Sequence, residues 1–360
     1  MHAAKLIGSY EEWCDCTIPF DPAARREKHT RMAASAFAFL RGSYPVWLDR
    51  FATDAAHKAP PVPLGVGDLH VENFGTWIAP AGEAFGVNDY DETGPVPFTN
   101  DLVRLATSAV LAVRAGRLRL DPKDIAQHLW AGYGASRGGA AGVALGDESV
   151  PHVAAVAAMW QAAQPGAEHF WKRIDALPEA PAGASPEPAP GYIPQTRRIR
   201  TAGLGSRDHL RLLLVGELGG ERVAFERKPL APTAARYLAG AAPQPDPRPY
   251  ASVLERQHER SPTLRAQVRV EGETIVRRLD PRRGRIEIVD LPDRRDEHAL
   301  LWMMGYCTAA HHGLSADTGR FAEAFDARTL EHAATRMAAL VTEDHADFCK
   351  HLSSSGHLRV

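Results

Sequence analysis

The stretch PLGVGDLHVENFG, Pro63 to Gly75, carries the least ordinary combination of side chains in the sequence. An acid that follows two glycines, Asp68, precedes His70 and, five positions after the acid, Asn73. A phosphoryl-transfer site needs a carboxylate near the attacking hydroxyl and oxygen ligands for one or two Mg²⁺ ions. Catalytic loops of the kinase type supply an Asp and, five positions later, an Asn. This spacing predicts that Asp68 is catalytic and that Asn73 binds metal.

A short hairpin is predicted directly after this stretch. The segments NFGTWIAP and FGVNDYD have the composition of two strands around a Pro-Ala-Gly turn. The returning strand would bring Asp89 close to Asn73, so Asp89 is predicted as the second metal ligand. If the strand continues that far, alternation places Asp91 on the same face as Asp89, where we expect it to support the site. With Glu92, three carboxylates fall within four positions.

These residues allow two other interpretations. The spacing between Asp68 and Asn73 is weak when taken alone, because an ordinary turn acid produces it by chance. The letters GDLH also resemble the first motif of dinuclear metallophosphoesterases, in which Asp and His ligate two metals. That class needs a later GNH motif, and none occurs in the sequence. We therefore interpret His70 as a residue that orders the loop.

The second half of a nucleotide site is predicted much later in the chain. The stretch TAGLGSRDHLRLLLV offers a turn in which Gly203, Gly205 and Ser206 could face phosphates. The strand RVAFERKPL presents Lys228 near its end, as the phosphate lysine of kinases is presented. The following helix, VLERQHE, offers Glu255 or Glu259 as the partner of this lysine.

Composition excludes several classes of protein. The 360 residues carry 42 Lys and Arg against 44 Asp and Glu, a net charge of −2, so neither nucleic acid nor an anionic membrane is expected as a partner. The basic runs TRRIR, Thr196 to Arg200, and DPRRGR, Asp280 to Arg285, are interpreted as solvated faces or turns. Four scattered cysteines, no signal peptide and no run of 18 apolar residues favour a cytoplasmic protein.

The order of patterns predicts an α+β architecture in four segments. Residues 1–175 form a first helical part that carries the catalytic and metal loops, and residues 176–195 form a Pro/Ala-rich linker. Residues 196–290 form a small β-rich lobe with a period of two, and residues 291–360 return to helix. In the first part, NDLVRLATSAVLAVRAG predicts an amphipathic helix with Asn100 as its cap.

The chain resembles the bacterial family catalogued as domain of unknown function 2252, which is grouped with the protein-kinase-like and aminoglycoside-phosphotransferase-like superfamily. The matching stretches are RMAASAFAFLRG, GVGDLHVENFG, VNDYDETGPVPFTNDLVRLATS, GLGSRDHLRLLLV, FERKPL, VLERQ, IVRRL and MGYCTAAHHGLSAD. The resemblance implies a two-lobed kinase-like fold that is circularly permuted, since the catalytic loop precedes the small β-rich lobe.

The resemblance also implies roles for single residues. By position, Asp68 resembles the catalytic acid, while Asn73 and Asp89 resemble the metal ligands. Asp101 matches a helix acid that braces the catalytic loop, Lys228 the phosphate lysine, and Glu255 its partner. Arg41 belongs to a family signature, FAFLRG, whose role the sequence does not reveal.

The chain departs from the phosphotransferase pattern in three places. Val66 stands where those enzymes often have a histidine before the Gly-Asp pair. The glycine turn contains Arg207 and Asp208, which would obstruct phosphates if they faced them. Pro229 follows Lys228 and removes one strand donor.

These observations predict a phosphotransferase that uses ATP and Mg²⁺ on an unknown small-molecule or peptide hydroxyl. Transfer of AMP by the same fold, and a non-catalytic protein that binds nucleotide, are the alternatives. The intact set of Asp68, Asn73 and Asp89 argues against a non-catalytic protein, since a scaffold needs no Mg²⁺ ligands. No stretch of the sequence indicates the acceptor.

Overall fold

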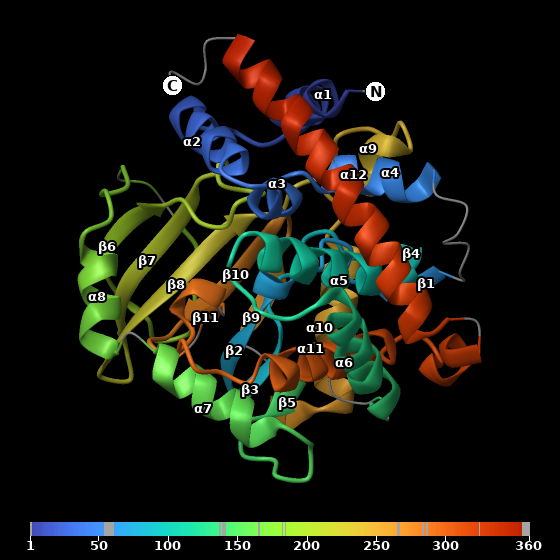
Figure 1. Ribbon diagram of the computed structural model, residues 1–360. Coiled ribbons are helices and arrows are strands. Elements are labelled where there is room, and N and C mark those ends of the chain that lie inside the picture. The colour runs from blue at the N-terminus through green and yellow to red at the C-terminus, as the bar shows by residue number, and fades with distance from the viewer. Residues whose placement is uncertain are drawn as a thin grey trace.

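The computed structural model describes residues 2–53, 61–136, 138, 142–164, 166–181, 183, 185–264, 267–282, 284–285, 287–323 and 325–354, which form a mixed α+β structure (Figure 1). The helices are α1 (Ala3–Asp15), α2 (Pro22–Ala33), α3 (Ala36–Gly42), α4 (Tyr44–Thr53), α5 (Phe98–Arg114), α6 (Pro122–Ala135), α7 (Val153–Ala163), α8 (Ala167–Asp175), α9 (Ala234–Leu238), α10 (Arg248–Arg260), α11 (Glu297–His312) and α12 (Ala327–Ser354). Short 3₁₀ turns are η2 (Val71–Asn73), η3 (Pro262–Leu264), η4 (Ile288–Asp290) and η5 (Thr318–Glu323).

The strands form three antiparallel sheets. The first pairs β1 (Pro61–Gly65) with β4 (Gly94–Pro97). The second has the order β11 (Gly284–Arg285), β2 (Phe74–Ala79), β3 (Gly82–Val87) and β5 (Gly142–Ala144). The third has the order β6 (Ile193–Arg200), β7 (Arg211–Leu218), β8 (Glu221–Pro229), β10 (Thr274–Leu279) and β9 (Val268–Glu271).

Figure 1 shows the five-stranded sheet and α8 on one side of the molecule, with α4, α5, α6, α11 and α12 gathered on the other. One large hydrophobic cluster joins the helical side, and it includes fully buried side chains from α3, α5 and α12 such as Phe39, Leu102 and Met337. The five-stranded sheet has two smaller clusters of its own, one around Phe225 and one around Leu213. The helical side therefore supplies most of the apolar burial.

The predicted hairpin is confirmed. Strands β2 and β3 pair from Phe74↔Val87 to Ala79↔Gly82, and Pro80 and Ala81 make the connection. The pairing returns the chain to the start of β2, where the Asn88 N–H donates to the Asn73 carbonyl at 3.0 Å. The acids that follow β3 thus lie beside the loop that precedes β2.

Helix α5 begins two residues before the predicted cap, at Phe98, with Pro97 at the N-cap. Pro97 has no N–H to leave unsatisfied and fixes its own φ angle, so it suits a helix start. Asn100 lies inside the helix, fully buried, and its amide donates to the Gly67 carbonyl at 3.1 Å. A residue predicted to cap the helix therefore holds the loop that carries Asp68 instead.

The segment predicted as a linker, 176–195, overlaps the five-stranded sheet, because β6 begins at Ile193. Glu179 forms an isolated bridge with Arg198 of β6, and the Ala180 N–H donates to the Arg197 carbonyl at 3.0 Å. In the described part of the chain, no helix combines the length and the apolar character needed to cross a membrane.

Candidate active site

Side chains of two helices, α5 and α11, fix the loop that carries Asp68. Asp101, at the start of α5 and fully buried, accepts the Val66 N–H at 2.7 Å and the Gly67 N–H at 2.9 Å. His312, in the last turn of α11, lies 2.9 Å from the same carboxylate. Gly67 has a φ of +86°, and a Cβ there would lie 2.4 Å from the Glu92 carbonyl oxygen. Only glycine therefore suits this turn.

Asp68 is held by one carboxylate oxygen. The Arg104 Nε donates to its Oδ1 at 2.9 Å, and a second nitrogen of the same guanidinium donates to that oxygen and to the Leu40 carbonyl. Arg104 is fully buried, with its guanidinium 4.9 Å and 5.1 Å from the ring centroids of Tyr44 and Trp47. The Asp68 side chain is 25% exposed. Arg104 therefore orients the carboxylate.

The pKa of Asp68 lies above the ordinary value of an aspartate. Enclosure of the carboxyl raises its pKa, and the opposing effect of the Arg104 guanidinium does not cancel the rise. The negative charge of Asp89 raises it further. A carboxylate whose pKa moves toward neutrality is a better proton acceptor, as a general base requires.

The side-chain amide of Asn73 has its orientation determined by two carbonyl groups. Its Nδ2 donates to the Asp68 carbonyl at 3.2 Å and to the Asp89 carbonyl at 3.1 Å. Since only the nitrogen can donate to a carbonyl, Oδ1 must point the other way. That oxygen is buried and has no hydrogen-bond partner among the described residues. A buried acceptor of this kind suits a cation or a donor on a ligand.

Asp89 and Asp91 face cations from the second half of the chain. The Lys228 Nζ lies 3.3 Å from each carboxylate oxygen of Asp89 and also contacts Asp91. The Arg285 guanidinium lies 3.3 Å from Asp89. Burial opposes ionisation, but Lys228 and Arg285 hold the pKa of Asp89 well below its usual range. Burial and the charge of Asp89 raise the pKa of Asp91.

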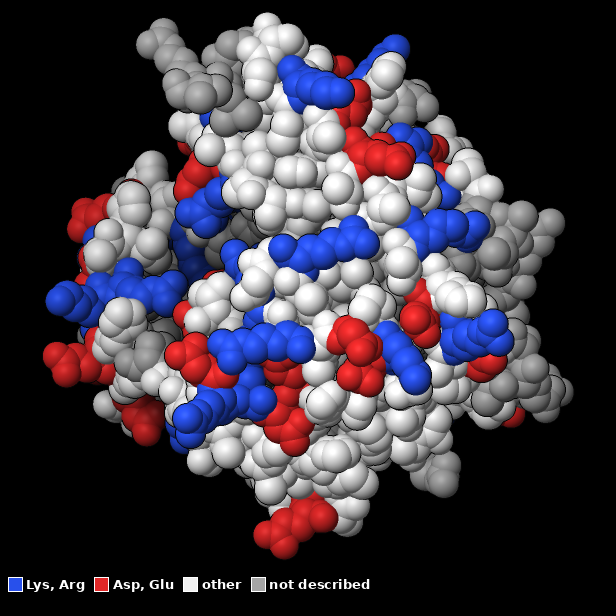
Figure 2. All heavy atoms as spheres, in the orientation of Figure 1, with Lys and Arg blue, Asp and Glu red and all other residues white. Residues whose placement is uncertain are grey.

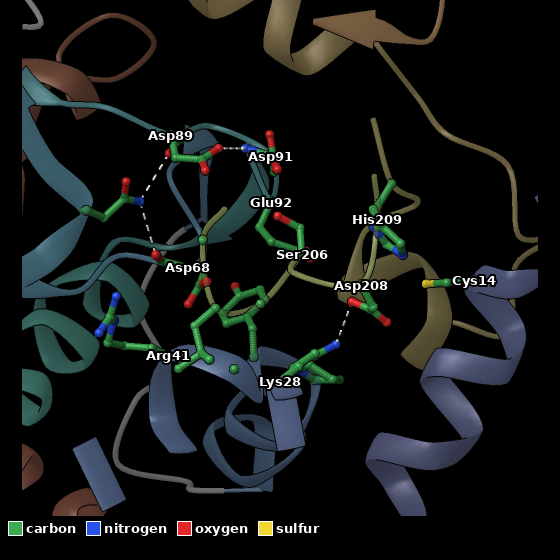
Figure 3. Close-up of a pocket in the computed structure, with 18 of the residues that line it drawn as sticks. Cys14, Lys28, Arg41, Asp68, Asp89, Asp91, Glu92, Ser206, Asp208 and His209 are labelled. Atoms are coloured by element: carbon green, nitrogen blue, oxygen red, sulfur yellow. Dashed lines mark hydrogen bonds and ion pairs between the residues drawn. The ribbon is translucent and has the colours of Figure 1, made fainter. Parts of the chain in front are cut away.

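Asp68, Asn73, Asp89, Asp91 and Arg285 line one cavity with about 950 Å³ of empty space, part of it open to solvent (Figure 3). The predicted glycine turn forms part of the cavity wall, since Gly203, Gly205 and Ser206 all line the cavity. The other lining residues are Tyr10, Glu11, Cys14, Arg25, Lys28, Arg41, Gly42, Tyr44, Pro45, Val66, His70, Glu92, Leu204, Asp208, His209 and Ala231.

The two charged residues of the glycine turn make ion pairs with α2. Arg207 pairs with Glu27 at 2.8 Å, and the buried Asp208 pairs with Arg25 at 2.8 Å and with Lys28 at 3.3 Å. The Asp208 carbonyl also accepts the Asp21 N–H at 2.9 Å. Arg207 and Asp208, which were expected to obstruct phosphates if they faced them, are therefore both engaged in ion pairs with α2.

The structure brings together every predicted site residue except Glu255. Lys228 has Asp89 and Asp91 as its carboxylate partners, whereas Glu255 is exposed on α10, so the expected pairing of Lys228 with Glu255 is corrected. Helix α10 instead contacts the acid motif, residues 89–92, through Gln257, whose amide donates to the Tyr90 hydroxyl at 2.8 Å. The buried side of the helix determines this contact, and Glu255 lies on the other side.

His70 lines the cavity, but its ring does not order the loop as the sequence predicted. Its side chain is 5% exposed, and Nδ1 has no partner in the described part of the chain. Burial and the charges of Arg41 and Arg285 lower the pKa of His70 well below the ordinary value. The ring is therefore neutral near pH 7.

Several residues of the site were not predicted. Arg104 lies three positions after Asp101, one turn further along α5, and this spacing could have revealed it. Arg285 belongs to a basic run interpreted as solvated, yet only 21% of its side chain is exposed.

Arg41, whose role the sequence left open, forms an ion pair of 2.5 Å with the buried Glu72. Glu92 accepts the Ala234 N–H at 2.8 Å, and burial raises its pKa.

Metal-binding arrangements are limited. Over the described ranges, no group of three or more His, Cys, Asp and Glu side chains is placed to hold a metal ion. Asn73 and Asp89 could supply an amide oxygen and a carboxylate, which are ligands that Mg²⁺ accepts together with water and phosphate oxygens. The residues present therefore fit a metal that arrives with a phosphate ligand.

Comparisons with known proteins gave one match. Neither the curated proteins nor the solved structures contain a match to this chain. A family model described as "Uncharacterized protein conserved in bacteria (DUF2252)" matches residues 21–155. That range contains the Asp68 loop, the β2–β3 hairpin and the acid motif. Over residues 21–155, the chain is thus similar to this bacterial family of uncharacterized proteins.

Proposed function

We propose that this protein is a phosphotransferase that uses ATP and Mg²⁺ to phosphorylate a hydroxyl group, and that its fold is a two-lobed kinase-like fold in permuted order. The five-stranded sheet would be the small lobe, and the helical side with the β2–β3 hairpin would be the large lobe. The order of the segments supports the permutation, because the Asp68 loop precedes the sheet that carries Lys228.

The observation that carries the proposal is the unpartnered Oδ1 of Asn73. Asn73 lines the cavity together with Asp68 and Asp89, and two hydrogen bonds of its amide nitrogen turn Oδ1 away from the carbonyl groups of those two residues. No contact within the described protein uses this oxygen. Asn73 and Asp89 would hold Mg²⁺, which when bound neutralises the charge of the phosphates.

Each remaining residue has a separate role in the proposed reaction. Asp68 would orient the acceptor hydroxyl and take its proton, since the hydrogen bonds from Arg104 engage Oδ1 and not Oδ2. Lys228 would leave Asp89 and Asp91 for the phosphates of the donor. Ser206 and the neighbouring glycines, which line the cavity, would contact those phosphates.

The products of ATP test the proposal. The purified protein is incubated with ATP, Mg²⁺ and a panel of small hydroxyl compounds and peptides, and the nucleotides are separated by chromatography. ADP together with a phosphorylated acceptor is the expected result. Pyrophosphate with an adenylylated acceptor would mean AMP transfer, and unchanged ATP that binds without turnover would mean a non-catalytic protein. Asp68→Asn is the control for a contaminating activity.

A further inference from the structure

The face of the five-stranded sheet that carries Lys228 also carries an unusual group of charges. Directly opposed residues of neighbouring strands point to the same face, as do residues two apart on one strand. Arg200 lies opposite Arg211, Glu226 lies opposite Arg277, and Lys228 follows Glu226 by two positions on β8. Leu213 lies opposite Glu226, which places Arg211 on this face as well.

Three guanidinium groups share one carboxylate at this place. Glu226 is fully buried and pairs with Arg200 at 2.5 Å, Arg211 at 3.2 Å and Arg277 at 2.6 Å. We call Arg200, Arg211 and Arg277 the arginine cluster. Among the described residues, three positive charges thus meet one negative charge, which leaves an excess of two.

An ion network that served stability alone would match its charges, because an uncompensated buried charge is costly. Arg211 is 2% exposed, and its Nε has no hydrogen-bond partner among the residues that the structure describes. The side chains of Arg200 and Arg277 are 28% and 19% exposed, so a ligand can reach them. The cluster therefore has an N–H group without a hydrogen-bond partner and more positive charges than carboxylates.

The cluster is continuous with the candidate active site. Arg211 donates to the Ser206 hydroxyl at 2.9 Å, and Ser206 lines the cavity. Arg277 is one of the charges that lower the pKa of Asp89. Figure 2 shows Lys and Arg side chains gathered in the hollow between the sheet-bearing side and helices α2 and α3. By the rise of a strand, Lys228 and Glu226 are roughly 7 Å apart along β8.

From this arrangement we infer that the sheet face is a binding site for a chain of phosphate groups that extends from Lys228 to the arginine cluster. Guanidinium groups bind phosphate oxygens through paired, charge-assisted hydrogen bonds. On this face the apolar Ile275 lies opposite Lys228, while the positions that lead from Lys228 to the cluster, Glu226 and Arg277, are charged. The ligand class is therefore a polyphosphate anion, either inorganic or the phosphate chain of a nucleotide.

The inference rests on the proposed function for the use made of this ligand, but its binding does not require turnover. The test is calorimetric titration of the full-length protein with inorganic tripolyphosphate, ATP and orthophosphate, with Mg²⁺ and without an acceptor. Tripolyphosphate is expected to bind more tightly than orthophosphate. Arg277→Gln and Arg200→Gln are each expected to weaken tripolyphosphate binding by about tenfold.

Arg222→Gln is the matched control, because Arg222 lies on β8 but pairs with Asp175 at the surface, where both side chains are exposed. It removes the same charge and is expected to change binding by less than about twofold. Circular dichroism and the melting temperature establish that each variant is folded. If Arg277→Gln is not folded, Arg200→Gln decides the result, because Arg200 is the most exposed member of the cluster.

Two results would overturn the inference. One is tripolyphosphate binding that is the same in the cluster variants as in Arg222→Gln. The other is binding of ATP without any binding of tripolyphosphate, which would mean that the base is recognised. Equal affinities for ATP and tripolyphosphate would show that the phosphate chain makes the contact. Tripolyphosphate binding without any turnover of ATP would contradict the proposed function but would still support this binding site.

Discussion

The ammonium of Lys228 lies 3.3 Å from both carboxylate oxygens of Asp89, although 139 positions separate the two residues. The contact joins the five-stranded sheet to the loop that follows the β2–β3 hairpin. It places a cation beside the acid that the sequence predicts as a metal ligand. In the proposed reaction, this ion pair is the resting state, and the phosphates of the donor replace Asp89 as the partner of Lys228.

Mg²⁺ should bind together with the nucleotide and only weakly alone. Lys228 and Arg285 already balance the charge of Asp89, so a metal gains little until phosphates engage these cations. Calorimetry is expected to give no measurable Mg²⁺ binding without ATP. Asp89→Ala should then weaken Mg·ATP binding by at least about tenfold, the scale of one lost charged contact.

The outcome that contradicts this assignment is unchanged Mg·ATP affinity in Asp89→Ala. Asp293→Ala is the control, because Asp293 is an acid outside the cavity lining. Its affinity for Mg·ATP should equal that of the wild type.

Asp68→Asn should separate binding from turnover. Asparagine keeps the size of the side chain and an oxygen that can accept from Arg104, but it loses the negative charge. Nucleotide affinity should remain near normal, while turnover falls by about two to four orders of magnitude, the usual scale for a general base. Slow ATP hydrolysis serves as the assay until the acceptor is known. Normal turnover on the true acceptor would mean that Asp68 only shapes the loop.

The pH dependence of turnover should report the environment of Asp68. Because its pKa is raised above the ordinary 3.8, the acid limb of kcat/KM is expected at a pH above that value. Arg104 lowers this pKa, so Arg104→Gln should move the acid limb to still higher pH. A rate profile measured between pH 4 and 8 on both proteins checks the direction. An identical limb in the variant would remove Arg104 as a positioning residue.

Glu11→Gln should destabilise the protein in a pH-dependent way. Burial opposes ionisation of Glu11, but Lys28 and His29 prevail and lower its pKa from 4.5 to about 2. A depressed acid pKa adds stability that is present above the unfolded value and is lost as pH falls through the folded value. Urea unfolding at pH 7 should show a loss of about 3–5 kcal/mol, as for a broken buried ion pair.

The difference in unfolding free energy between wild type and Glu11→Gln should narrow as the pH falls from about 4.5 toward 2. A difference that stays constant over this range would mean that lost packing, and not lost charge, destabilises the variant. Glu12→Gln, at the exposed neighbouring position of α1, is the control and should change stability by less than about 0.5 kcal/mol.

Local sequence was sufficient for those parts of the site that lie close together in the chain. The interval between Asp68 and Asn73, and the two-residue connection after Ala79, are properties of one short segment. Backbone alternation and turn chemistry act over a few residues, so they can be predicted without the rest of the chain. The hairpin, and with it the approach of Asp89 to Asn73, followed from this alone.

Tertiary structure decided which charged residues meet. Glu255 and Gln257 stand two positions apart on α10, and packing of the helix made Gln257 the buried one. Arg200 and Arg285 end two basic runs that any sequence rule assigns to solvent, yet one lies beside Glu226 and the other beside Asp89. The partner of a charge is determined by Coulomb interaction across a buried interface, and that interface exists only after distant strands have packed.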